Sequence, residues 1–129
     1  MTRIYVATVV ANAPAARLAM LVAHAHGHVV TYDWTQLDGD QREHAVRELD
    51  AIRVSAVVLY LEHPEACTTF SEVGAALVLG RRVIAVGADP RVEHRNFLLA
   101  HHPLVRHVAD VEEAMAELEE ITRPGEVTE

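Results

Sequence analysis

The amino-acid sequence predicts an α/β fold, in which a parallel sheet is covered by helices on both faces. Short apolar segments rich in Val and Ile alternate with segments whose apolar residues recur at helical spacing. The apolar segments show no clear polar–apolar alternation, which is typical of strands buried on both faces. Such alternating elements form a parallel sheet through right-handed crossovers. The pattern contains five such units, for which we expect the doubly wound, flavodoxin-like strand order 2-1-3-4-5.

Turn residues and helical periodicity set the expected bounds. We expect strands at residues 3–10, 28–33, 56–61, 83–86 and 104–108, and helices at 15–26, 41–53, 69–79, 94–100 and 111–121. Gly27 and Gly80 should end the first and third helices, because glycine readily adopts the left-handed conformation found there. Apolar residues at helical spacing mark three helices, namely Leu18, Leu21, Val22 and Ala25, then Ala45, Val46, Leu49 and Ile52, and finally Val111, Ala114, Met115 and Leu118.

Composition favours one domain and argues against several partners. Of the 129 residues, 50% are apolar, which suits one core, expected over residues 1–122 with a flexible tail at 123–129. A net charge of −8 argues against binding a nucleic-acid polymer. No apolar run approaches the ~20 residues of a membrane span, and no signal-peptide pattern opens the chain, so we expect no membrane association. The single cysteine, Cys67, fits the reducing cytoplasm.

The strand order predicts where a ligand binds. In such sheets, ligands bind outside the carboxyl ends of the strands, where the strand order reverses. The reversal falls between the first and third strands, so the loops at residues 8–14 and 62–72 should face each other across a crevice. Glu72 ends the second loop in the first turn of a helix, and its carboxylate should open into that crevice.

Glu72 has two readings from the residues alone. Thr69 and Glu72 fit a capping box, in which each side chain bonds the other residue's backbone N–H at the start of a helix. Alternatively, Glu72 is a catalytic carboxylate, which the helix N-terminus would keep ionised with a low pKa, as a nucleophile requires. Both readings remain open at this point.

One stretch resembles a known enzyme family. Residues 71–84 read SEVGAALVLGRRVI. They contain a glutamate, a glycine two residues later, a helix of small residues, a second glycine, and a strand that begins with basic residues. With IYVA at 4–7, VVLY at 57–60, GHVVTYDWT at 27–35 and NFLLAHHP at 96–103, this stretch resembles the nucleoside 2-deoxyribosyltransferase family, which includes nucleoside and nucleotide N-glycosidases and is similar in fold to flavodoxin.

The resemblance implies a specific chemistry, and we expect that chemistry to need no cofactor. Glu72 would attack the anomeric carbon of a ribosyl or deoxyribosyl group in a nucleoside or nucleoside 5′-monophosphate, release the base and form a glycosyl ester. Water or a second base would then resolve the ester. Tyr5 matches the family tyrosine that orients the nucleophile, although an ordinary strand tyrosine is equally consistent with the sequence. In relatives a neighbouring subunit often completes the pocket, so we expect a homo-oligomer.

The sequence also departs from the family pattern. The turn after the first strand lacks glycine, and Ala66 stands where relatives carry a helper aspartate. Glu62 and Glu65 are nearby candidates for a replacement acid. These departures leave open a second function, a non-catalytic module that binds a nucleoside or nucleotide.

Further candidates for substrate contacts surround the expected crevice. Trp34 could stack on a base whose edge Asp33 bonds, whereas the structural alternative is a tryptophan covering a sheet edge beside a turn. Thr68 and Thr69 could donate hydrogen bonds to a 5′-phosphate at a helix N-terminus, or simply cap it. The remaining candidates are Thr8, Glu62, His63 and Asn96.

The nine histidines do not form a recognisable metal motif. His24 and His28 are four residues apart, but Gly27 should end the helix between them, and one cysteine is too few for a structural zinc site. The loop after the first strand lacks the Ser/Thr/Gly-rich cradle of a flavin phosphate, and no dinucleotide fingerprint is present. We therefore expect neither a metal nor a cofactor.

Overall fold

The computed structural model describes residues 1–36, 39–89 and 96–122. The predicted tail at 123–129 and the start of the helix predicted at 94–100 lie outside these residues. The strands are β1 (Arg3–Ala7), β2 (Val29–Val30), β3 (Val57–Leu61), β4 (Arg82–Val86) and β5 (Val105–Val108). The helices are η1 (Val10–Asn12), α1 (Ala13–Ala25), α2 (Gln41–Val54), α3 (Thr69–Val78), α4 (Phe97–His101) and α5 (Val111–Thr122).

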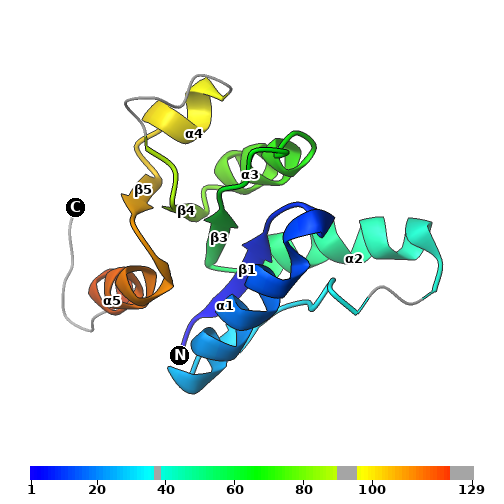
Figure 1. Ribbon diagram of the computed structural model, residues 1–129, viewed down its shortest axis with the longest axis horizontal. Coiled ribbons are helices and arrows are strands. Elements are labelled where there is room, and N and C mark those ends of the chain that lie inside the picture. Colours follow the sequence, from blue (N-terminus) through cyan, green and yellow to red (C-terminus); the bar gives the residue numbers. More distant parts are fainter. Residues whose placement is uncertain (37–38, 90–95, 123–129) are drawn as a thin grey trace.

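The five strands form one parallel sheet in the order β2-β1-β3-β4-β5, which confirms the predicted doubly wound topology. Helices α1 and α5 pack together along one face, whereas α2, α3 and α4 cover the other (Figure 1). All five residues of β3 are buried, as expected for the central strand of a sheet covered on both faces. β1 and β3 are direct neighbours, with Tyr5 beside Val58 and Ala7 beside Tyr60.

Two strands are shorter than predicted. The first ends at Ala7 rather than continuing to residue 10, because the Thr8 hydroxyl donates a hydrogen bond to the Leu61 carbonyl (3.0 Å) and the chain then turns into η1. The second has only Val29 and Val30 in the sheet, at its edge, where a strand pairs with one neighbour only. Both changes lengthen the loops at the carboxyl ends of these strands.

The buried faces of α1 and α2 differ from the residues that marked these helices in the sequence. In α1 the buried residues are Ala16, Ala19, Met20 and Ala23, whereas Leu18 and Leu21 are exposed. In α2 Ile52 is buried as expected, together with Ala51, whereas Val46 and Leu49 are exposed. The expected inner residues of α5 do lie inside, with Ala114, Met115 and Leu118 almost fully buried.

Helix α3 begins one residue earlier than the capping box requires. Thr68 occupies the N-cap position and no side chain caps the helix, so Thr69 is the first helical residue. Glu72 therefore falls in the fourth helical position, beyond the reach of a reciprocal box. The capping-box interpretation of Thr69 and Glu72 is wrong for this structure. Gly80 ends the helix as expected, with a positive φ of 73°.

Candidate active site

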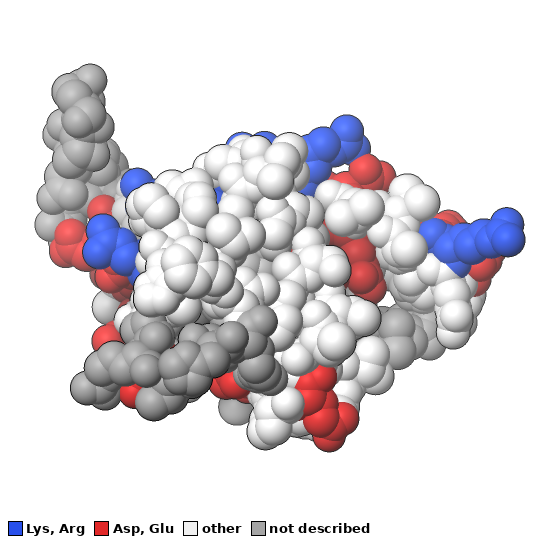
Figure 2. Space-filling model, turned by 90° about the horizontal axis from the view of Figure 1, so that it is seen from above, with Lys and Arg blue, Asp and Glu red and all other residues white. Residues whose placement is uncertain are grey.

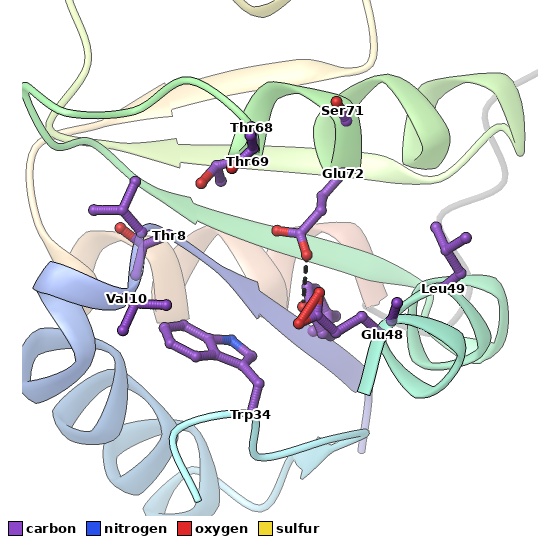
Figure 3. Close-up of a pocket in the computed structure, with 12 residues that line it drawn as sticks. Thr8, Val10, Trp34, Glu48, Leu49, Thr68, Thr69, Ser71 and Glu72 are labelled. Atoms are coloured by element: carbon purple, nitrogen blue, oxygen red, sulfur yellow. Dashed lines mark hydrogen bonds between the residues drawn. The ribbon is translucent and has the colours of Figure 1, made fainter. Parts of the chain in front are cut away.

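A cavity of about 370 Å³ lies where the strand order reverses (Figure 3). It is bounded by β1 and its following loop, by Trp34 after β2, by the middle of α2 and by the first turn of α3. The predicted loops after β1 and β3 both contribute to its wall, as expected from the topology. The lining residues are Tyr5, Thr8, Val9, Val10, Trp34, Ala45, Glu48, Leu49, Thr68, Thr69, Ser71 and Glu72.

The cavity contains a hydrogen bond between the two residues that the family resemblance assigned to catalysis. The Tyr5 hydroxyl donates to Glu72 Oε2 at 2.9 Å, and the two residues are 67 positions apart in the chain (Figure 3). Tyr5 comes from β1 and is only 1% exposed, whereas Glu72 reaches in from the first turn of α3. The sheet and the helix therefore hold the phenol and the carboxyl group in a fixed relation.

Burial dominates the electrostatics of this pair. Burial raises the pKa of Glu72 from its usual 4.5 to about 8, and the nearby Glu48 carboxyl adds to the rise, while the Tyr5 hydrogen bond opposes it. The pKa of Tyr5 is raised far above its usual value, first by burial and then by Glu72. The tyrosine hydroxyl therefore stays protonated and remains a donor. The expected low pKa of Glu72 is wrong, because desolvation outweighs the helix N-terminus.

Trp34 and Thr8 form part of the wall and are held by backbone groups. The Trp34 indole N–H donates to the Val6 carbonyl at 2.6 Å, and the side chain is 4% exposed. The Thr8 hydroxyl, already bonded to Leu61, also accepts from the Asn12 side chain at 3.1 Å. The indole ring therefore presents a rigid aromatic wall to whatever occupies the cavity (Figure 3).

Thr68 and Thr69 line another part of the cavity wall. They occupy the start of α3, above the carboxyl group of Glu72 in the view of Figure 3. Thr69 is buried, and Thr68 accepts a backbone hydrogen bond from Ser71 N at 2.9 Å. The two hydroxyl groups and the helix N-terminus make this the polar end of the cavity.

The other four predicted contact residues do not line this cavity. Asp33 accepts from the backbone of Thr35 at 3.0 Å in an exposed turn. Glu62 accepts from the Tyr60 hydroxyl at 2.6 Å and lines a different cavity, between α1 and α5. His63 accepts from Glu65 N at 3.1 Å, and Asn96 caps α4 by accepting from Leu99 N at 2.9 Å.

Sequence reasoning missed one charged residue of the cavity, Glu48 on α2. Residues His44, Glu48, Ala51 and Ile52 make a stripe of lower exposure along that helix, at the spacing of one helical face. This stripe was the signal that could have revealed Glu48. Its apolar part is short, so Val46 and Leu49 suggested a different inner face.

Metal binding and membrane insertion find no support in the described residues. Over residues 1–36, 39–89 and 96–122, no three His, Cys, Asp or Glu side chains gather in an arrangement that could hold a metal ion. Within the same ranges, every helix is too short or too polar to span a bilayer.

The fold resembles that of solved proteins, although no family model and no curated protein matches the sequence. The structure of a CMP N-glycosidase, BcmB, from Clostridium botulinum superposes with a TM-score of 0.64 at 16% identity, covering 92% of this chain and 98% of that one. A conserved protein from Enterococcus faecalis V583 also gives a TM-score of 0.64 at 16% identity, covering 94% and 99%. At this identity the comparisons show a shared fold, and this α/β fold is one that an N-glycosidase uses.

Proposed function

We propose that this protein cleaves the N-glycosidic bond of a nucleoside or nucleoside 5′-monophosphate, with Glu72 as the nucleophile. The observation that carries the proposal is the buried Tyr5–Glu72 hydrogen bond beside an aromatic wall in a cavity at the sheet's switch point. The fold shared with a CMP N-glycosidase supports the same chemistry. A purely structural Glu72 is disfavoured, because its carboxyl group caps no helix and lies in the cavity instead.

The proposed reaction has two steps. A Glu72 carboxylate oxygen attacks the anomeric carbon as the bond to the base breaks through an oxocarbenium-like transition state. The Tyr5 hydroxyl holds the other carboxylate oxygen so that the attacking one is aimed at the sugar. Trp34 supplies the surface against which the base or sugar packs. Water then cleaves the glycosyl ester, or a second base accepts the sugar.

The direct test is a panel of ribo- and deoxyribonucleosides and their 5′-monophosphates, with free base measured by chromatography. We expect at least one member to release its base at a rate that scales with enzyme concentration. Adding a second free base distinguishes transfer, which yields a new nucleoside, from hydrolysis. Saturable binding of these compounds without any base release would instead indicate the non-catalytic binding module.

Replacing Tyr5 with phenylalanine should lower base release by roughly 10–100-fold, which corresponds to a charge-assisted hydrogen bond of about 1.5–3 kcal/mol. The ring remains in the core, but Glu72 loses its donor. Because that hydrogen bond lowers the Glu72 pKa, its loss raises the pKa and leaves less ionised nucleophile. The measurement is kcat/KM beside the wild type. Tyr32→Phe is the matched control, since Tyr32 does not line the cavity, and an unchanged Tyr5→Phe rate would contradict the role given to Tyr5.

We also propose that a second copy of the chain covers the face formed by α3 and α4. Much of the view in Figure 2 is free of charged side chains, and Val78 and Phe97 on these helices are 89% and 76% exposed. Exposed apolar surface of this kind favours association. We expect light scattering to give a dimer or larger assembly for the wild type, and a monomer for Val78→Lys. The control is Leu21→Lys on α1, across the sheet, which should leave association unchanged; a monomeric wild type would refute the proposal.

A further inference from the structure

The cavity contains a second carboxyl group opposite the first. Glu48 reaches in from α2 toward the Tyr5–Glu72 hydrogen bond (Figure 3), and both carboxyl groups line the same cavity. In the view of Figure 2, acidic atoms lie inside a hollow on the side of the molecule where α2 lies. Like charges in one cavity disfavour ionisation of both carboxyl groups, and Glu48 adds to the rise in the Glu72 pKa, so one proton is available to the pair near neutral pH.

Packing directs Glu48 inward. Its helix buries Ala51 and Ile52, three and four residues further along, so Glu48 shares the face of α2 that packs toward the sheet. Other acids of α2 lie outside and pair with arginines, Glu43 with Arg47 at 2.6 Å and Asp50 with Arg53. Among the described residues, Glu48 has no such cationic partner.

Of the groups around the pair, Tyr5 acts on Glu72 directly. Tyr5 donates its hydrogen bond to Glu72 rather than to Glu48, and this favours the ionised form of Glu72. The other titratable neighbour is Tyr32, which lies close enough to Tyr5 to disfavour its ionisation and bonds His44, one turn before Glu48. Tyr5 therefore stabilises Glu72 whenever the one proton of the pair is on Glu48.

We propose that Glu48 is the second catalytic carboxyl group of this site, the acid and base that replaces the helper aspartate missing at Ala66. This inference rests on the proposed N-glycosidase function. In the first step the bond between the anomeric carbon and the base breaks, its electrons stay on the base, and the base takes the proton from Glu48. In the second step Glu48 removes a proton from water as the water oxygen attacks the anomeric carbon and frees Glu72. The sugar leaves, and the pair again holds one proton.

The deciding experiment compares two leaving groups in Glu48→Gln. Nucleobase release should fall by about 10²–10⁴-fold, mainly in kcat, because general acid–base catalysis contributes on that order. A p-nitrophenyl glycoside of the same sugar needs no protonation, so it should give a burst of p-nitrophenol equal to the enzyme present. Without Glu48 as general base, the glycosyl enzyme accumulates. Azide needs no general base, so it should restore turnover by forming the glycosyl azide.

Matched variants separate the outcomes. Glu43→Gln, on the outer face of the same helix, should behave as the wild type, and Glu72→Gln should give no burst with either substrate. A Glu48→Gln enzyme with wild-type nucleobase release, or with equal losses on both substrates and no azide rescue, would overturn the inference while leaving the proposed function intact. A wild type inert towards every substrate would overturn both.

A titration of the free protein tests the coupling between Glu48 and Glu72 without any turnover. Carbon-13 NMR of labelled glutamate side chains follows the titration of Glu72 in the free protein. Because Glu48 raises the Glu72 pKa through its charge and hydrogen bond, Glu48→Gln should move the Glu72 midpoint to lower pH, and Glu43→Gln should not. An unmoved midpoint in Glu48→Gln would contradict the shared proton.

Discussion

A Glu72→Gln variant should release base at least about 10⁴-fold more slowly than the wild type, the scale expected when a nucleophile is removed. Glutamine has the same shape and can still accept the hydrogen bond of Tyr5, but its neutral amide cannot form the glycosyl ester. The measurement is base release by chromatography, with mass spectrometry of the intact protein to detect the covalent intermediate. A glycosylated Glu72→Gln protein, or base release within tenfold of the wild type, would exclude Glu72 as the nucleophile.

The same substitution should stabilise the protein above neutral pH. The Glu72 pKa is raised in the folded state, from 4.5 to about 8, so the folded protein holds this proton more tightly than the unfolded chain. That contribution to stability is complete below pH 4.5 and is lost as the pH rises toward about 8. Glutamine has no proton to lose, so the variant should gain roughly 4 kcal/mol at pH 8, because the contribution of the raised pKa is almost fully lost there and one pKa unit corresponds to about 1.4 kcal/mol.

Urea unfolding at pH 4, 6 and 8 tests this second effect. The difference between Glu72→Gln and the wild type should grow with pH and be close to zero at pH 4. A constant difference would mean that the burial of Glu72 is not what the substitution relieves. A joint gain in stability and loss of activity is the pattern expected when a fold holds a carboxyl group in place for chemistry.

The topology could be predicted from the sequence because it depends on the order of elements rather than on their ends. Strands without alternation indicated a sheet covered on both faces, and the regular order of strand and helix left few allowed arrangements. The position of the cavity followed from the same reasoning, since the reversal of strand order fixes which loops meet. The pairing of Tyr5 with Glu72 was expected only from the family resemblance, and the structure shows the hydrogen bond between them.

The inner faces of α1 and α2 could not be predicted, because each helix has two apolar stripes. In α1 the stripe of larger side chains that includes Leu18 and Leu21 reads as more hydrophobic, yet the stripe of Ala16, Ala19 and Ala23 faces the sheet. Small side chains let a helix lie close to a sheet, and this distance depends on tertiary packing that periodicity does not report. Glu48 could not be predicted as a site residue for the same reason, since it lies on the short inner stripe of α2.

The start of α3 shows how one residue changes a role. A helix beginning after Thr69 would have used Glu72 as a cap, whereas a helix beginning at Thr69 places Glu72 one position further round. Its carboxyl group then meets Tyr5 instead of a backbone N–H. Helix ends are the least predictable feature of a sequence, so the choice between a cap and a catalytic group required the structure.

Trp34 should be the residue of the cavity wall whose truncation costs most stability. Trp34→Ala should lower the free energy of unfolding by about 3–5 kcal/mol, because it removes a large side chain that is 4% exposed. It also removes the donor to the Val6 carbonyl on β1. Trp34→Phe keeps an aromatic ring but loses this donor, so its cost should be smaller, about 1–3 kcal/mol. Urea unfolding followed by circular dichroism measures both, and a loss below 1 kcal/mol for Trp34→Ala would contradict this packing role.

The same two variants separate stability from substrate contact. If the indole forms the wall on which the base or sugar packs, Trp34→Ala should raise KM well above the value for Trp34→Phe, since stacking on an aromatic face is worth about 1–3 kcal/mol per base. The chain has a single tryptophan, so quenching of its fluorescence in the wild type reports substrate binding at this wall directly. Equal KM values in both variants, together with unquenched fluorescence at saturating substrate, would place the base elsewhere. A raised KM with little change in kcat assigns Trp34 to binding and leaves the chemistry to the carboxyl groups above it.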